Sequence, residues 1–161
     1  MRFEHIIQIN APHDPSLPLL SREQVWRGLA LRAYDPAHFI IGLEGCAIED
    51  HQREDTGREH LARTLHFGSF EVHDRVTLDP MEQTRVEVAA TDKWPKCTAT
   101  AQIEEPEPLS IFVRFTYEWD DGDAAEQVLS DDERQLRQQA CQAMDMDTVS
   151  RIRELASGGM A

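Results

Sequence analysis

The sequence predicts an α+β fold: a first strand, two short helices, six further antiparallel strands and a long C-terminal helix. Two observations carry this prediction. Short segments that alternate between apolar and polar residues fill residues 43–119, with turn residues between them. Two Ser-x-x-Gln/Glu patterns begin at Ser21 and Ser130, each at the start of an expected helix. Alternation at period two is typical of strands with one covered face, and the Ser-x-x-Gln/Glu pattern is typical of helix starts.

The first elements are a strand over residues 2–9 and two short helices after a proline-rich loop, APHDPSLPLL. Ser21 and Gln24 form a capping-box pattern, in which the serine oxygen and the glutamine side chain each satisfy a free backbone N–H. Asp35 followed by Pro36 predicts the second helix start, because proline fits the first helical position.

The central part of the chain predicts an antiparallel meander. Residues 58–67 and 70–78 flank Gly68-Ser69, and glycine suits the tight turn of a hairpin. Asp79-Pro80 ends the second of these strands. The later strands are expected over residues 84–90, 97–104 and 109–119. The last one carries a row of large apolar residues: Leu109, Ile111, Val113, Phe115, Tyr117 and Trp119.

A long helix is expected between the capping-box pair Ser130 and Glu133 and the stop at Gly158-Gly159. At 1.5 Å per residue it is about 40 Å long. Its narrow apolar stripe runs through Leu136, Ala140, Met144, Thr148, Ile152 and Leu155.

Composition and charge are typical of one soluble globular domain, which we expect to span residues 1–161. The net charge is −14, from 30 acidic and 16 basic residues. Such a field repels phosphate backbones and anionic membrane surfaces, so we expect no nucleic-acid partner and no membrane partner. The three cysteines form no CxxC pair and the N-terminal stretch has no apolar leader. Both observations favour reduced thiols in the cytoplasm.

This order of elements resembles the helix-grip fold. The stretch VWRGLALRAYDPAHFIIGLEGCAIED is similar to the segment that leads into the second strand in the SRPBCC superfamily, which includes START domains, polyketide cyclases and the birch pollen allergen group. FEHIIQIN, LSREQVWRGL, LHFGSFEVHDRVTL, FVRFTYEW and VSRIRELA are similar to an AtaL-like branch of bacterial and fungal proteins. The resemblance covers nearly the whole chain, and its motifs are structural rather than catalytic. It implies a curved sheet around the final helix, with a cavity between them that opens near the two short helices.

The hairpin places one charged pair on the face that should look inward. A two-residue loop at Gly68-Ser69 sets Arg63 opposite Asp74. The other opposed pairs are apolar: Leu61 with Val76, Leu65 with Val72 and Phe67 with Phe70. A buried ion pair seldom adds stability over apolar residues of the same size, so water or a ligand is expected to share it. The alternative is an edge pair that reaches solvent.

Small residues at inward positions indicate an incompletely filled core. They are Ala90, Ala99, Ala101, Ala140 and Thr148. A dry void costs about 24 cal/mol per Å³, so the space should be narrowed, wet or occupied. Candidate anchors for water are Arg63, Asp74, Thr84, Tyr117 and Asp145.

We therefore expect the cavity to bind a small hydrophobic molecule, with an acidic or carbonyl group near Arg63. The expected ligand-binding residues are Phe39, Leu61, Arg63, Leu65, Asp74, Val76, Thr84, Val88, Ala99, Val113, Phe115, Tyr117, Met144 and Thr148. For Phe39, Phe115, Tyr117 and Met144, plain core packing is the alternative interpretation.

Signals for catalysis, metals and cofactors are weak. GxSxG, phosphate-loop, dinucleotide and HExxH motifs do not occur, so no cofactor is expected. His60, His66 and His73 fall on the outer face, and the loop WDDGD lacks the spacing of a calcium loop, so no metal site is expected. Binding is the favoured function. The alternatives are an enzyme of the polyketide cyclase or hydrolase type that uses Asp74 and Arg63, and a protein-interaction module with a filled core.

Overall fold

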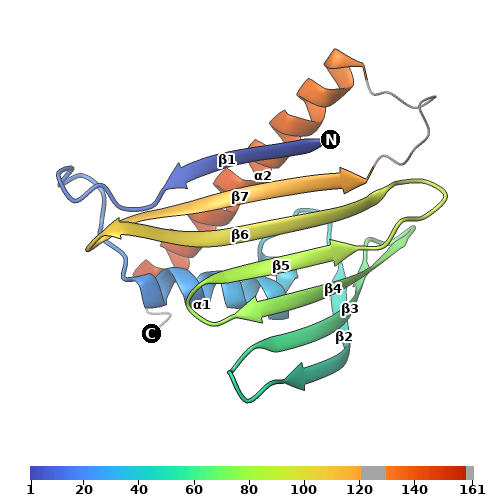
Figure 1. The fold of residues 1–161 in the computed structure, drawn as a ribbon, viewed down its shortest axis with the longest axis horizontal. Helices are drawn as coiled ribbons and strands as arrows, with labels where there is room; N and C mark the ends of the chain where they lie inside the picture. Colours follow the sequence, from blue (N-terminus) through green and yellow to red (C-terminus); the bar gives the residue numbers. More distant parts are fainter. Residues whose placement is uncertain (121–129, 159–161) are drawn as a thin grey trace.

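The computed structural model describes residues 1–120 and 130–158 and confirms the α+β prediction. One seven-stranded sheet has the order β1-β7-β6-β5-β4-β3-β2, with every neighbouring pair antiparallel. The two α-helices lie on one face of this sheet (Figure 1). The elements are β1 (Arg2–Gln8), α1 (Arg22–Tyr34), the 3-10 helix η1 (Pro36–His38), β2 (Gly45–Arg53), β3 (Glu59–His66), β4 (Glu71–Asp79), β5 (Gln83–Val88), β6 (Lys96–Glu107), β7 (Ser110–Asp120) and α2 (Asp131–Ser157).

Both predicted helix starts are confirmed, with a full capping box at α1 and the serine half of one at α2. The Ser21 side chain accepts a hydrogen bond from the Gln24 backbone N–H, and the Gln24 side chain accepts one from Ser21. In the same way, Ser130 accepts from the Glu133 backbone N–H at the start of α2. The expected acidic loop from residue 121 onward and Gly159 lie outside the described residues.

The second short helix is a 3-10 turn of three residues rather than an α-helix. The Asp35 side chain caps no backbone N–H there. Instead, a carboxylate oxygen of Asp35 lies 3.0 Å from His38 Nε2. Gly42, with a φ of 86°, follows four residues after His38 and turns the chain toward β2. Only three residues separate His38 from Gly42, so the chain has no room for a longer helix here.

The predicted register of the central hairpin is confirmed. Arg63 pairs with Asp74, flanked by Leu61 with Val76 and Leu65 with Val72. The turn residue Gly68 has a φ of 84°, a conformation that glycine adopts without strain.

Three details of the strand and helix predictions are wrong. Strand β5 ends at Val88, so Ala90 lies beyond it and is exposed. Leu109 precedes β7 in a turn with a φ of 65° and is not part of the inward row. In α2, Leu136 and Ala140 are exposed because the first turns of this helix project past the sheet (Figure 1). The buried residues of α2 are Cys141, Asp145, Thr148, Val149 and Ile152.

The main core lies between β1, β7, β6 and the two helices. Ile111, Val113 and Phe115 from β7 are almost fully buried there, with Ile152 of α2 and Leu29 of α1. A second, smaller cluster joins α1 to β3 and β4; it contains Ala33, Leu61, Val76 and Leu78.

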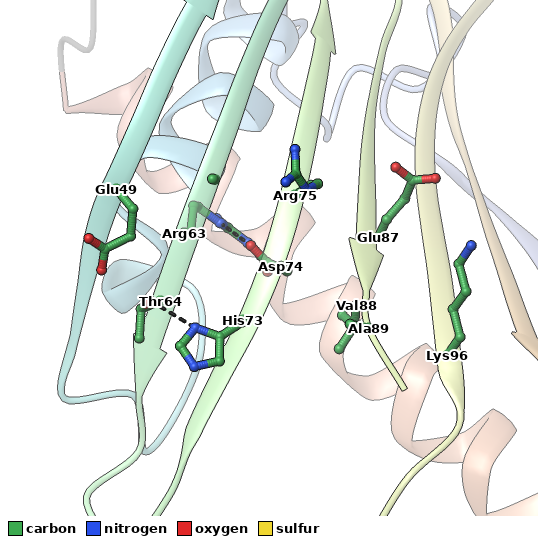
Figure 2. Close-up of a pocket in the computed structure, with 11 residues that line it drawn as sticks. Glu49, Arg63, Thr64, His73, Asp74, Arg75, Glu87, Val88, Ala89 and Lys96 are labelled. Atoms are coloured by element: carbon green, nitrogen blue, oxygen red, sulfur yellow. Dashed lines mark hydrogen bonds and ion pairs between the residues drawn. The ribbon is translucent and has the colours of Figure 1, made fainter. Parts of the chain in front are cut away.

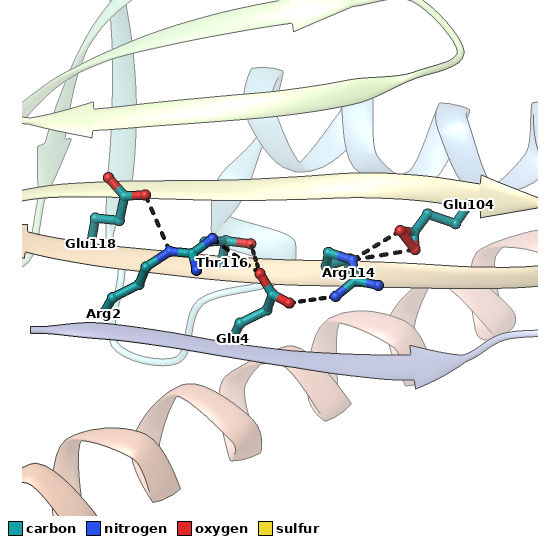
Figure 3. Close-up of polar contacts among 6 residues, drawn as sticks. All are labelled: Arg2, Glu4, Glu104, Arg114, Thr116 and Glu118. Carbon is teal, nitrogen blue, oxygen red and sulfur yellow. Dashed lines mark hydrogen bonds and ion pairs between the residues drawn. The ribbon is translucent and has the colours of Figure 1, made fainter.

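The opposite face of the sheet carries charged side chains. Figure 3 shows Arg114 of β7 between Glu4 of β1 and Glu104 of β6. Arg114 Nε donates to Glu104 Oε1 at 2.9 Å, and the same guanidinium also binds Glu4. This face is therefore suited to solvent, and the helices cover only the other one. No helix within the described residues is long and apolar enough to cross a bilayer.

Candidate functional site

A cavity of about 250 Å³ lies between the sheet and α1. The inner faces of β3 to β6 form one wall, and Leu29, Arg32 and Ala33 of α1 form the other. Pro36 and Ile40 lie at the end toward η1. Among the described lining residues, α2 contributes only Met144. The sequence predicted a cavity under the C-terminal helix, but α1 is its main helical wall.

Nine of the predicted binding residues meet at this cavity. They are Arg63, Leu65, Asp74, Val76, Thr84, Val88, Ala99, Tyr117 and Met144. Other lining residues were missed: five belong to α1, η1 or the segment just after it, and four come from the strands and the hairpin turn. They are Leu29, Arg32, Ala33, Pro36, Ile40, Phe67, Val72, Val86 and Cys97. The wall is mainly apolar, with few polar groups.

Five predicted residues do not line the cavity. Phe39, Val113 and Phe115 are packed in the main core, Leu61 belongs to the smaller cluster, and Thr148 is fully buried in α2. The Thr148 hydroxyl donates to the Met144 carbonyl oxygen of its own helix. Strand parity predicted the correct face for the residues of the sheet, but an inward side chain can meet a helix directly instead of a cavity.

The Arg63–Asp74 pair lies inside the molecule, at 5% and 6% exposure, so the edge-pair alternative is wrong. Arg63 Nε donates to Asp74 Oδ1 at 2.8 Å, and Nη2 donates to Oδ2 at 2.7 Å. Arg63 Nη1 donates to the carbonyl oxygen of Ala33 at 2.7 Å. The pair thus ties β3 and β4 to α1, and the Arg63 charge already has a bidentate partner.

A second buried polar group contains Tyr117, which lines the cavity, together with Asp145 and His5. The Tyr117 hydroxyl donates to Asp145 Oδ1 at 2.5 Å, and His5 Nε2 lies 2.6 Å from Asp145 Oδ2. Burial raises the pKa of Asp145, although hydrogen bonds from Tyr117 and His5 oppose this shift. Burial, together with the Asp145 charge, raises the pKa of Tyr117. Tyr117 therefore keeps its hydroxyl neutral and directs it at Asp145.

His5 was missed as a partner of Asp145, because 140 residues separate them. One signal was available, since His5 alternates with Phe3 and Ile7 on the inward side of β1 and pairs with Phe115. Arg32 was also missed. It follows Leu29 by three positions and immediately precedes Ala33, both of which are buried residues of α1.

Arg32 differs from Arg63 in its surroundings. It is half-buried and lines the cavity, but no hydrogen bond or ion pair joins it to any other residue that the structure describes. Its positive charge does reach Asp145, where it acts with Tyr117 and His5 against the burial that raises the carboxyl pKa.

A second hollow, of about 380 Å³, lies on the opposite face of the sheet. Figure 2 shows Glu49, Arg75, Glu87 and Lys96 around it, on the side away from the helices. The predicted outward position of His73 is confirmed, since its side chain is 70% exposed and lines this hollow. Within residues 1–120 and 130–158, no three His, Cys, Asp or Glu side chains come close enough together to hold a metal ion. This open, charged hollow suits a small apolar molecule less well than the inner cavity does.

Comparisons with known proteins agree with this architecture. A family model described as acetylaranotin biosynthesis cluster protein L, AtaL, matches residues 7–159. No curated protein matches the sequence.

Solved structures with a similar fold include three of different kinds. The Zhui aromatase/cyclase from Streptomyces sp. R1128 is 16% identical, with a TM-score of 0.60 over 100% of this chain and 96% of that chain. Ara h 8.0201 is 13% identical, with a TM-score of 0.59 over 96% and 98% of the two chains. A START superfamily protein from Mycobacterium smegmatis is 14% identical, with a TM-score of 0.53 over 96% and 98%. These similarities confirm the helix-grip fold.

Proposed function

This chain belongs to the AtaL family, and we propose that it binds a small, largely apolar molecule in the cavity between α1 and strands β3 to β6. The observation that carries the proposal is the cavity itself, whose wall is mainly aliphatic and aromatic. Apolar walls with a few polar groups are typical of small-molecule sites, because burial supplies affinity and the polar groups supply orientation.

The energetic cost of an unfilled cavity supports the same proposal. At about 24 cal/mol per Å³, a dry void of about 250 Å³ costs about 6 kcal/mol. The whole stability of a domain is about 5–15 kcal/mol. Water can fill the space near Arg63, Asp74 and Tyr117, but Leu29, Leu65, Val76 and Val86 offer water no hydrogen bonds. An apolar ligand would pack against these aliphatic side chains and displace the water.

The alternative is an enzyme of the polyketide cyclase or hydrolase type in the same cavity. The name of one structural neighbour, an aromatase/cyclase, supports it. In this alternative, Asp74 accepts a proton from the substrate and Arg63 stabilises the resulting charge. Both Asp74 oxygens, however, already accept hydrogen bonds from Arg63, and Arg63 also binds Ala33. Two groups held by each other are poorly placed for this chemistry, so binding is the preferred function.

Filling the cavity tests the proposal. Ala99 lies on the cavity wall, so the Ala99→Phe side chain would occupy ligand space. We expect this variant to bind naphthamide, a neutral apolar probe, at least about tenfold more weakly than the unmodified protein. Intrinsic fluorescence titration would measure the affinity, and native mass spectrometry of protein purified gently from its own host would weigh any small molecule that stays bound.

The matched control is Ala62→Phe. Ala62 lines the outer hollow rather than the inner cavity, so this variant adds the same side chain on the opposite face. It should leave probe affinity unchanged. Equal affinity in the unmodified protein and in Ala99→Phe, or a loss confined to Ala62→Phe, would refute binding in the inner cavity.

A further inference from the structure

We infer that the ligand carries an acidic group and that Arg32 is the residue that binds it. This inference rests on the proposed function, because it concerns the same cavity. It moves the polar anchor away from Arg63, the residue to which the sequence pointed, and it names the ligand class as small apolar acids rather than neutral apolar molecules.

The first step is the balance of charge along the cavity wall. Three of the described lining residues carry formal charges at neutral pH: Arg32, Arg63 and Asp74. Arg63 and Asp74 form a bidentate pair, so their charges compensate each other. One positive charge, that of Arg32, remains uncompensated on the wall itself.

The second step is the hydrogen-bonding capacity of the two arginines. A guanidinium has five N–H donors in a planar fork that matches a carboxylate. Arg63 uses three of its nitrogens on Asp74 and Ala33. Arg32 donates to no other described residue. It is therefore the arginine with its whole fork available to a ligand.

Asp145, a buried carboxyl that feels the charge of Arg32, already has other partners. Its two oxygens bind Tyr117 and His5, and no Arg32 nitrogen comes within ion-pair distance of it. A half-buried cation without a partner has lost part of its hydration with no compensating contact. A ligand carboxylate would supply that contact, and the apolar wall would bury the rest of the molecule.

Because of the net charge of the whole protein, a preference for an acid over a neutral ligand would be specific evidence for a cation in the cavity. A net charge of −14 disfavours anions near the surface, so a cavity without a local cation should prefer neutral ligands. A preference for an acid over its neutral amide therefore requires a cation at the site. Among the charged residues of the wall that the structure describes, Arg32 can provide it, since Arg63 is neutralised by Asp74.

The experiment compares naphthoate with naphthamide, two probes of nearly equal shape that differ in charge. At neutral pH we expect the unmodified protein to bind naphthoate at least about tenfold more tightly, which corresponds to about 1.4 kcal/mol. Arg32→Gln should remove this preference by weakening naphthoate alone. Arg32→Lys should keep part of the preference, since it retains the charge but loses the planar fork. Isothermal titration calorimetry would measure all affinities.

The control is Arg27→Gln, on the same helix. Arg27 is exposed and does not line the cavity, so this variant makes the same change of net charge outside the site. It should retain the preference for naphthoate. Equal binding of the two probes by the unmodified protein, or an unchanged preference in Arg32→Gln, would overturn the acid assignment and leave apolar binding intact. Failure of both probes to bind would overturn the proposed function together with this inference.

Discussion

At the scale of single residues, the Arg63–Asp74 pair has a structural role that follows from its contacts. It connects β3, β4 and the α1 carbonyl of Ala33 inside the protein. Desolvation offsets much of the attraction within such a pair, whereas removal of one member leaves a buried charge without a partner. The pair should therefore tolerate joint replacement far better than single replacement.

We expect Asp74→Leu to lower the free energy of unfolding by about 3–5 kcal/mol, because Arg63 would stay buried and unpaired. The double variant Arg63→Met with Asp74→Leu should recover most of this loss. Urea unfolding followed by tryptophan fluorescence would measure both. A double variant less stable than the single variant would contradict this account of the pair.

Asp145 predicts a pH dependence of stability. Its pKa is raised from 3.8, mainly by burial, so the folded state holds the proton more tightly than the unfolded state does. Between 3.8 and the raised value, the folded state binds more protons, and stability falls as pH rises. The contribution of Asp145 is thus fully present below 3.8 and is lost as pH increases through the folded-state pKa.

The variant Asp145→Asn should remove this part of the pH dependence. Its stability relative to the unmodified protein should increase as pH rises from about 3.8, because asparagine does not ionise. Urea unfolding across a pH series would test this. The same difference in stability at every pH would show that Asp145 titrates alike in both states.

At the scale of elements, the crossing of α1 and α2 holds the cavity wall in place. Gly28 of α1 meets Ile152 of α2 so closely that an added Cβ would lie 2.6 Å from Ile152 Cγ1. A glycine inside a helix costs about 1 kcal/mol relative to alanine. Here the close approach explains its presence, since only a missing side chain lets α1 lie this near to α2.

Gly28→Ala should therefore destabilise the protein by about 1–3 kcal/mol, despite the better helix propensity of alanine. Thermal and urea unfolding would measure the loss. Gly45→Ala is the control, because a Cβ at Gly45 meets no atom within 4 Å, and its effect should stay within about 0.5 kcal/mol. A neutral or stabilising Gly28→Ala would mean that the helices shift apart without cost.

At the scale of the whole molecule, the cavity follows from a mismatch between the widths of the two layers. Seven strands spaced about 4.8 Å apart span about 29 Å, whereas a helix with its side chains is about 10 Å wide. Helix α2 lies behind β1, β7 and β6, and α1 lies behind the middle strands (Figure 1). The helices therefore do not fill the space under β3 to β6.

A domain spanning residues 1–161 and a cytoplasmic location remain predictions from the sequence.

The sequence alone determined the elements and the faces of the strands, because these depend on local geometry. Alternation assigned the inward residues of β3 and β4, and the tight turn at Gly68 set Arg63 opposite Asp74. Capping boxes located the starts of both helices. Each of these signals acts over a few residues, so it can be read directly from the chain.

Only the tertiary structure decided where the layers separate and which charges stay unpaired. Phe115 and Tyr117 share one face of β7 and one core cluster, but only Tyr117 of the two also lines the cavity. His5 contacts Asp145 across 140 residues, and Arg32 lines the cavity because α1, rather than α2, forms the main helical wall. The physical reason is that strand parity gives direction alone, whereas a cavity and its charge balance depend on distances between elements far apart in the chain.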